Sequence, residues 1–199
     1  MIKAIIFDFG GVLSKKGSFK PLCKKYAKKH NVSYNGFYDV LRDIWFKTRT
    51  NKVDSKLFWK ECADYLNIDP VKLKKDMMKS DGYNKKTIRL IKKLKKEYKV
   101  GLLSNHIEDW LEEIIQKRKL DKLFDVIVTS YGSKLAKPDI KIFKEIVKKL
   151  KVKPQECIFI DDIKTNIPPA KKLGMKTILF KNLNQTKKEL NKFGIKCTK

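Results

Sequence analysis

Asp8 is the first residue of this 199-residue chain that could do chemistry. It follows a short, largely apolar run at residues 3–7 and is followed closely by Gly10 and Gly11. The run is too short and too rich in β-branched residues for a helix, and the glycines end it, so we predict a strand with Asp8 at its carboxyl end. Open α/β sheets bind ligands at this edge. A carboxylate there can act as a nucleophile or a metal ligand, and residues without a Cβ let backbone amides approach an anion.

Three later motifs follow the same rule, in which polar side chains stand where a predicted strand ends or a predicted helix begins. They are Ser104-Asn105 after the apolar residues 100–103, Lys137 before the helix that Pro138 and Asp139 open, and Asp161-Asp162 after residues 157–160, with Asn166 close behind. A small polar pair can hold a phosphate, and adjacent carboxylates suit Mg²⁺, a hard cation that prefers oxygen ligands.

In their order and context these motifs resemble those of the haloacid dehalogenase-like (HAD) hydrolase superfamily, from residue 3 to about residue 180. For a phosphatase of that family, the resemblance implies that Asp8 forms an aspartyl-phosphate and that Lys137 is catalytic. The implied phosphate ligands are Gly11, Ser104, Asn105 and Lys137, and the implied Mg²⁺ ligands are Asp8, the Gly10 carbonyl, Asp161 and Asp162, with Asn166 in support.

Charge balance leads to the same cofactor. Asp8 and the paired acids would repel a phosphate dianion unless a divalent cation lay between them. Phosphoryl transfer needs mainly positioning and positive charge around the phosphoryl oxygens, and Lys137 supplies a second positive group. We therefore expect Mg²⁺ as the cofactor and a small phosphorylated metabolite as the substrate.

Gly10 departs from the resemblance. Most phosphatases of the family carry a second Asp at this position, which protonates the leaving oxygen and later activates water. General acid–base assistance is typically worth about a hundred- to ten-thousand-fold, so its loss predicts a slow enzyme, a good leaving group or a replacement group. His106 is a conceivable replacement because its ordinary pKa is near neutrality, although a lone loop histidine is more often a surface residue.

Two alternatives to a phosphatase remain open. Haloacid dehalogenases also lack the second Asp, but they use no metal, and the charges of Asp161 and Asp162 would then be uncompensated. Arg42 could bind the carboxylate of a haloacid, although an arginine on a helix is more often simply exposed. The net charge of +26 would suit a catalytically weak protein that binds nucleic acid. Because only four of the 48 basic residues are arginine, the preferred residue for phosphate and base recognition, we favour a solvated basic surface.

Residues 16–83 read as helical throughout. Apolar residues recur at three- and four-residue spacing over residues 19–30, 36–47, 54–66 and 70–79. The predicted helix caps are Ser33, Asp54, Asp69 and Asn84. In the family, an insertion at this point is a cap that covers the site and selects substrates. Trp45, Phe46 and Trp59 could line that cleft or simply hold the bundle together.

The rest of the chain alternates between helix and strand. We predict helices at residues 84–98, 107–117, 139–150, 165–173 and 184–193, and strands at 99–103, 125–129, 157–160 and 176–180. Short links between such elements favour an α/β fold with a Rossmann-like, doubly wound parallel sheet. We therefore expect a core domain at residues 1–15 and 84–199 and a small α-helical cap domain at residues 16–83.

Composition indicates a cytoplasmic protein without a membrane segment. No apolar run approaches the roughly twenty residues needed to cross a bilayer, and the amino terminus is already the first predicted strand, which leaves no room for a signal peptide. The cysteines, at positions 23, 62, 157 and 197, lack metal or redox spacing and are expected as reduced thiols. Substrate identity and oligomeric state are open.

Overall fold

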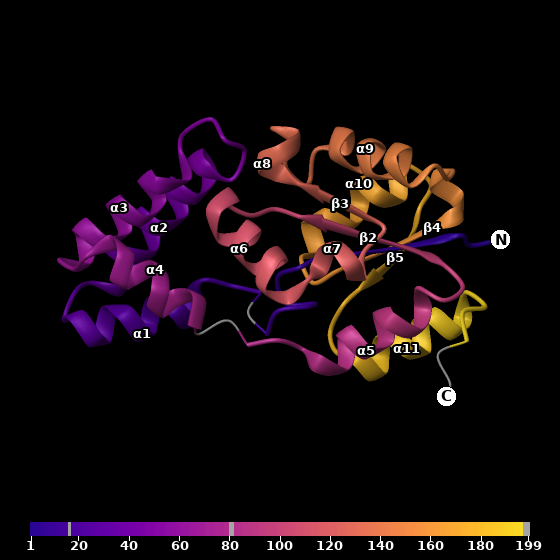
Figure 1. The fold of residues 1–199 in the computed structure, drawn as a ribbon, viewed down its shortest axis with the longest axis horizontal. Coiled ribbons are helices and arrows are strands. Elements are labelled where there is room, and N and C mark those ends of the chain that lie inside the picture. The colour runs from indigo at the N-terminus through magenta and orange to yellow at the C-terminus, as the bar shows by residue number, and fades with distance from the viewer. Residues whose placement is uncertain (16, 80–81, 197–199) are drawn as a thin grey trace.

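The centre of the molecule is a five-stranded parallel sheet, seen in a computed structural model that describes residues 1–15, 17–79 and 82–196 (Figure 1). The strands are β1 (Ala4–Phe7), β2 (Lys99–Ser104), β3 (Val126–Thr129), β4 (Cys157–Asp161) and β5 (Lys176–Leu179). Their order is β3-β2-β1-β4-β5, so the chain winds outward from β1 in one direction and then in the other. The point of reversal lies between β1 and β4, where doubly wound sheets bind their ligands. The predicted Rossmann-like α/β fold is confirmed.

Helices cover both faces of the sheet because successive strand residues point to opposite sides. Ile5 and Phe7 share one apolar cluster, and Ala4 and Ile6 share another. The first cluster includes α5 (Lys85–Leu94), α6 (Glu108–Arg118), α7 (Leu120–Leu123) and α11 (Leu183–Lys192), and the second includes α9 (Ile140–Leu150) and α10 (Ile167–Lys172). All of β1 is fully buried, so the residue that follows it rests on a rigid base.

Of the five helices described between β1 and β2 in the chain, the first four gather at one end of the molecule (Figure 1). This helical insertion consists of α1 (Lys20–His30), α2 (Tyr34–Thr48), α3 (Ser55–Leu66) and α4 (Pro70–Lys79). The four predicted caps are confirmed: a backbone N–H of the following turn donates to the side chain of Ser33, Asp54, Asp69 and Asn84. Leu41, Phe58 and Leu73 are fully buried, so the insertion has an apolar interior.

The two chain segments that connect the insertion to the sheet run side by side. Ser14 and Tyr83 form an antiparallel bridge, and the backbone N–H of Lys15 donates to the Gly82 carbonyl at 2.7 Å. The predicted domain boundaries fall here, with residue 16 outside the described residues; the division into two domains stays a prediction.

Polar contacts tie the insertion to α6, the helix that follows β2. Trp59 Nε1 and Lys74 Nζ both donate to Asp109 Oδ2, at 2.8 Å and 2.9 Å. Asn51 Nδ2 donates to Glu108 Oε2 at 2.8 Å. These contacts hold the insertion close to the carboxyl end of β2.

Some details differ from the sequence prediction. The helix expected over residues 84–98 ends at Leu94, because the N–H groups of Lys96 and Glu97 donate to carbonyls three residues back and tighten the chain into turns. The helices α7 and α8 (Ser130–Ser133) have four residues each, too few to show a period in the sequence. Within the described ranges, no helix is long and apolar enough to cross a membrane. Cys23, Cys62 and Cys157 are buried free thiols, and Cys197 lies outside the described residues.

Candidate active site

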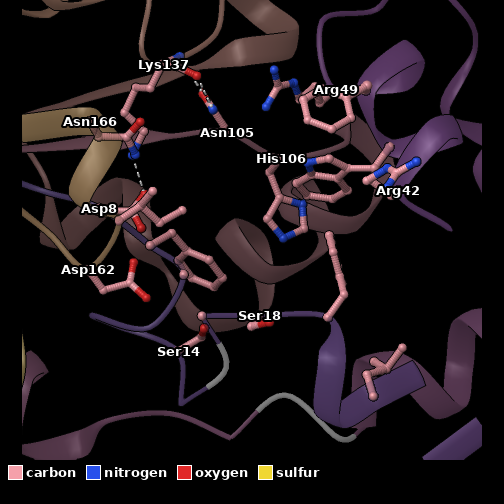
Figure 2. Close-up of a pocket in the computed structure, with 18 of the residues that line it drawn as sticks. Asp8, Ser14, Ser18, Arg42, Arg49, Asn105, His106, Lys137, Asp162 and Asn166 are labelled. Atoms are coloured by element: carbon pink, nitrogen blue, oxygen red, sulfur yellow. Dashed lines mark hydrogen bonds and ion pairs between the residues drawn. The ribbon is translucent and has the colours of Figure 1, made fainter. Parts of the chain in front are cut away.

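The four sequence motifs meet at the carboxyl end of the sheet (Figure 2). Asp8 follows β1, and its backbone N–H donates to the Ile160 carbonyl of β4 at 2.9 Å. Ser104 ends β2, and Asp161 ends β4, so the two strands beside β1 bring their last residues to the same edge. Lys137 reaches this edge from the loop before α9. The predicted convergence is therefore present.

Lys137 is a buried cation that bridges two of the carboxylates. Its Nζ donates to Asp8 Oδ1 and to Asp161 Oδ2, both at 2.6 Å, and to the Leu103 carbonyl at 2.9 Å. These three contacts use all three donors of the ammonium group. Lys137 is 2% exposed, Asp8 5% and Asp161 0%, so the charges interact with little screening by water.

Asn105 fixes the backbone of Lys137. Its Oδ1 accepts from the Lys137 N–H, and its Nδ2 donates to the Lys137 carbonyl, both at 2.9 Å. This reciprocal pair holds the loop in register with the end of β2. The side-chain amide that was predicted to bind phosphate is thus engaged in positioning the lysine.

The two acids after β4 have different surroundings. Asp161 Oδ1 accepts from the Ile163 N–H at 2.7 Å, and its Oδ2 also accepts from Asn166 Nδ2 at 3.0 Å, so Asn166 supports it as expected. Asp162 Oδ1 is buried and has no hydrogen-bond partner in the described part of the chain. Gly11, at φ +69°, makes room for this side chain, because a Cβ there would lie 2.1 Å from Asp162 Oδ2.

Burial works against ionisation of these carboxylates. It is the main cause that raises the pKa of Asp8 to about 7, against the opposing effect of Lys137. Burial, followed by the charge of Asp161, raises the pKa of Asp162 to about 6. Burial also disfavours the charged form of Lys137, but Asp8 and Asp161 outweigh it and raise the pKa of the ammonium group. Asp8, Lys137, Asp161 and Asp162, here called the charge cluster, therefore hold more negative charge than Lys137 can offset.

A magnesium ion would fit the charge cluster. Asp8, Asp161 and Asp162 each offer an oxygen, and these atoms all lie within 4.8 Å of one another. Such an all-oxygen set is what Mg²⁺ prefers. A divalent cation would compensate the carboxylates and give the buried Asp162 Oδ1 a partner. Gly10, whose carbonyl was predicted as a further ligand, lines the space beside them.

A cavity of about 380 Å³ opens over Asp8 and Lys137. Its aromatic walls come from both parts of the chain, with Phe9, His106 and Trp110 from the core and Phe19, Tyr38, Trp45 and Phe46 from the insertion. Trp45 and Phe46 therefore line the cavity, as one of the two sequence interpretations expected. Trp59 does not, since its indole nitrogen binds Asp109 instead.

Two predicted phosphate ligands lie behind the cavity wall. Ser104 and Gly11 are not among the residues that line the cavity. The Ser104 hydroxyl is buried at the end of β2 and has no hydrogen-bond partner within the described residues. It is free to bond with a ligand oxygen, and the phosphate contacts of both residues stay predictions.

His106 is buried, so the expectation of a surface histidine was wrong. Its ring meets those of Phe9, Trp45 and Trp110 edge to face, with centroids 5.2–5.8 Å apart. Burial lowers the pKa of His106 to about 4, so the imidazole is neutral at neutral pH and carries no imidazolium proton to give to a leaving group. Trp110 is four residues away, but Phe9 and Trp45 come from distant segments, so the sequence alone did not reveal this burial.

Two arginines line the cavity, and only Arg42 forms ion pairs with described residues. Arg42 is exposed, as the plainer interpretation expected, and its guanidinium bonds to Asp39 at 3.2 Å and to Asp43 at 3.1 Å. Arg49 also lines the cavity but forms no ion pair with any described residue. The sequence analysis had given Arg49 no role in the site.

The fold and this arrangement define a hydrolase of known type. The family model of haloacid dehalogenase-like hydrolases matches residues 2–174, and the chain belongs to this family.

Relatives of similar length are phosphatases. The chain is 26% identical over 202 residues to D-ribitol-5-phosphate phosphatase from Bacteroides thetaiotaomicron, covering 96% of this chain and 97% of that protein. It is 25% identical over 201 residues to glyceraldehyde 3-phosphate phosphatase from Methanocaldococcus jannaschii, covering 89% and 84%. Other relatives are far longer: the chain is 33% identical over 105 residues to bifunctional epoxide hydrolase 2 from Sus scrofa, and this match spans 49% of the chain and 18% of that protein.

A solved structure shares the fold. It is that of a HAD family enzyme from Bacteroides thetaiotaomicron in complex with magnesium and inorganic phosphate. The TM-score is 0.74 at 24% sequence identity, and the match covers 91% of this chain and 95% of that chain.

Replacing Lys137 by Met should destabilise the metal-free protein. Breaking a buried ion pair leaves uncompensated charge, so we expect the free energy of unfolding to fall by roughly 3–5 kcal/mol in urea denaturation at about pH 8. The loss should shrink at about pH 5, where the Asp8 carboxyl, whose pKa is about 7, is protonated. Lys141→Met, at an exposed position of α9, is the control and should change stability by no more than about 0.5 kcal/mol. Equal stability of the two variants would contradict the account.

His106 should make the protein less stable in acid. Its folded pKa of about 4 lies below the ordinary 6.5, so the unfolded chain binds a proton that the folded chain does not, and stability is lost as pH falls between these values. The shift corresponds to about 3 kcal/mol. His106→Gln should remove this part of the pH dependence, measured as the difference between variant and wild type, which cancels the contributions of the carboxylates. If the free energies of unfolding of wild type and His106→Gln changed in parallel over this pH range, His106 would not be held neutral in the folded protein.

Proposed function

We propose that this hydrolase is a Mg²⁺-dependent phosphatase of small phosphorylated metabolites that acts through an aspartyl-phosphate at Asp8. The observation that carries the proposal is the charge cluster beneath the cavity, where three buried or half-buried carboxylates surround one ammonium group. Such a set lacks positive charge, which a divalent cation would supply, and with the cation and Lys137 in place the anionic phosphoryl group could approach Asp8. The phosphatase names of the full-length relatives support the same reaction.

Asp8 is the nucleophile in this proposal. One carboxylate oxygen attacks phosphorus and the bond from phosphorus to the ester oxygen breaks, while the Lys137 ammonium, 2.6 Å from Asp8 Oδ1, turns toward the phosphoryl oxygens and stabilises their charge. Water then attacks the aspartyl-phosphate, which releases inorganic phosphate and restores Asp8. Asp8, Asp161, Asp162 and the Gly10 carbonyl would hold Mg²⁺, which supplies further positive charge to the phosphoryl oxygens when bound. Asn105 and Asn166 keep Lys137 and Asp161 in place through the hydrogen bonds described above.

The helical insertion acts as a cap in this proposal. Trp45 and Phe46 of α2 face the same cavity as Asp8 and Lys137, so a substrate bound there lies between the insertion and the core. Enclosure of this kind excludes water and strengthens the electrostatic contacts to the phosphate. We also infer a cytoplasmic location, which the buried free thiols support.

Two observations favour the phosphatase over the dehalogenase alternative. Without a metal, Lys137 alone would face three carboxylates. Arg42, the candidate clamp for a haloacid, is engaged by Asp39 and Asp43. The only feature that favours nucleic-acid binding is the basic surface, whose lysines are spread over the helices. Salt-sensitive retention of the protein on DNA would support that role.

The test of the proposed function is phosphate release from a panel of phosphorylated metabolites. Wild type should release phosphate with Mg²⁺ and lose activity with a chelator, and Asp8→Asn should lower kcat by at least about a thousandfold because the nucleophile is gone. Asp121→Asn, at an exposed position of α7, should retain wild-type kcat. Turnover by Asp8→Asn near the wild-type rate, or turnover without metal, would overturn the proposal.

Gly10 predicts a strong dependence on the leaving group. With neither an acid at residue 10 nor a charged His106, the leaving oxygen departs unprotonated, so aryl phosphates should be hydrolysed much faster than alkyl phosphates. Gly10 does not lie at positive φ, so its backbone conformation is open to residues other than glycine. Gly10→Asp should raise kcat/KM for alkyl phosphates by at least about tenfold, within the usual range of general acid catalysis, and Gly10→Asn should not. Equal wild-type rates for the two ester classes would show that another acid is present.

A further inference from the structure

Arg49 is a cation on the cavity wall that lacks a counter-charge. It forms no ion pair with any residue that the structure describes, and its Nε atom is buried without a hydrogen-bond partner there. Burial also lowers the pKa of this guanidinium below its ordinary value. Partly buried cations are usually paired, because removing a charge from water is costly unless another charge compensates it. The surroundings of Arg49 are therefore those of an ion pair whose negatively charged partner is missing.

Arg42 provides an internal comparison. It lies on α2, two turns before Arg49, which directly follows that helix, and it lines the same cavity. Its guanidinium is engaged by Asp39 and Asp43. Within the described residues, the chain thus supplies charged partners for Arg42 and none for Arg49. The difference indicates that the partner of Arg49 comes from a ligand.

The position of Arg49 is well defined. Its backbone N–H donates to the Trp45 carbonyl at 3.0 Å, and its carbonyl accepts from Ser130 Oγ at 2.5 Å, which joins the end of α2 to the core. The guanidinium carbon lies 4.3 Å from the centre of the Phe46 ring. The ring covers one face of the guanidinium and leaves its N–H groups free at the edge, the geometry that binds a carboxylate or phosphate with two parallel hydrogen bonds.

The guanidinium faces the reacting groups. Figure 2 shows it pointing from the end of α2 toward Asn105, whereas Arg42 lies farther from Asp8, beyond His106. Asp8 and Lys137 belong to the opposite, core wall of the same cavity. A substrate whose phosphoryl group meets Asp8 would therefore extend its remaining part along the aromatic wall toward Arg49.

We propose that Arg49 binds a second anionic group of the substrate, so that the preferred substrates are small phosphate monoesters whose leaving group carries a carboxylate or a second phosphate. The inference rests on the proposed function and narrows its substrate class. Asp8, Lys137 and the metal site handle the transferred phosphoryl group, and Arg49 recognises the other end of the molecule. Aromatic side chains, among them Trp45 and Phe46, confine the part between them.

The test compares two esters that differ only in this second charge, para-carboxyphenyl phosphate and para-carbamoylphenyl phosphate. Wild type should prefer the carboxylate ester in kcat/KM. Arg49→Met should reduce that preference by roughly 10- to 100-fold, the range for a charge-assisted hydrogen-bonded pair, while kcat/KM for the carboxamide ester stays within about threefold of wild type. Arg49→Lys should keep part of the preference, because lysine retains the positive charge but lacks the paired N–H donors of the guanidinium. Para-phenylene bisphosphate in the same assay distinguishes a second phosphate from a carboxylate.

Arg42→Met is the matched control, because Arg42 lies on α2, seven residues before Arg49, and lines the same cavity. It should leave the preference within about threefold of wild type, the behaviour of an exposed, internally paired side chain. A wild type that hydrolyses both esters equally would overturn the role of Arg49 and leave the phosphatase intact. Equal losses on both esters in Arg49→Met, or loss of the preference in Arg42→Met instead, would also overturn it. No phosphate release from any ester would overturn the proposed function itself.

Discussion

The ion pairs of Lys137 with Asp8 and Asp161 are the interaction on which the site depends. A buried ammonium group is tolerable only with compensating oxygens, and the sheet supplies them from the ends of adjacent strands. In return, the ammonium partly offsets two carboxylates that burial would otherwise neutralise. The strand order, with β1 between β2 and β4, is what brings these groups together.

The same cluster explains why the site is suited to bind ions as well as to hold the fold together. One lysine does not balance three carboxylates. The raised pKa of Asp8 and of Asp162 is consistent with this, because it means that ionisation of these carboxyl groups is disfavoured. In the proposed function a divalent cation would compensate this charge, and the phosphoryl group would then meet positive charge from the metal and from Lys137. In the same proposal, neither the neutral His106 nor the glycine at position 10 supplies a proton to the leaving group.

Much of this could be predicted from the sequence because it depends on local patterns. Asp8 stands directly after β1, Ser104 and Asp161 are the last residues of β2 and β4, and parallel strands bring such residues to one edge. His106 and Arg49 could not be found in this way. His106 is buried partly by Phe9 and Trp45, which are distant in the chain. Arg49 is half-buried and, unlike Arg42, has no ion pair with a described residue, and no period in the chain reveals this.

The measurement that tests the central claim most directly is mass spectrometry of the enzyme after acid quenching during turnover of a phosphate ester. An aspartyl-phosphate is stable enough in acid to be located, and the account predicts one added phosphoryl group on the peptide that contains Asp8. The label should require Mg²⁺ and be absent from Asp8→Asn. Steady turnover with an unmodified Asp8 peptide, or with the phosphoryl group on another residue, would contradict the account.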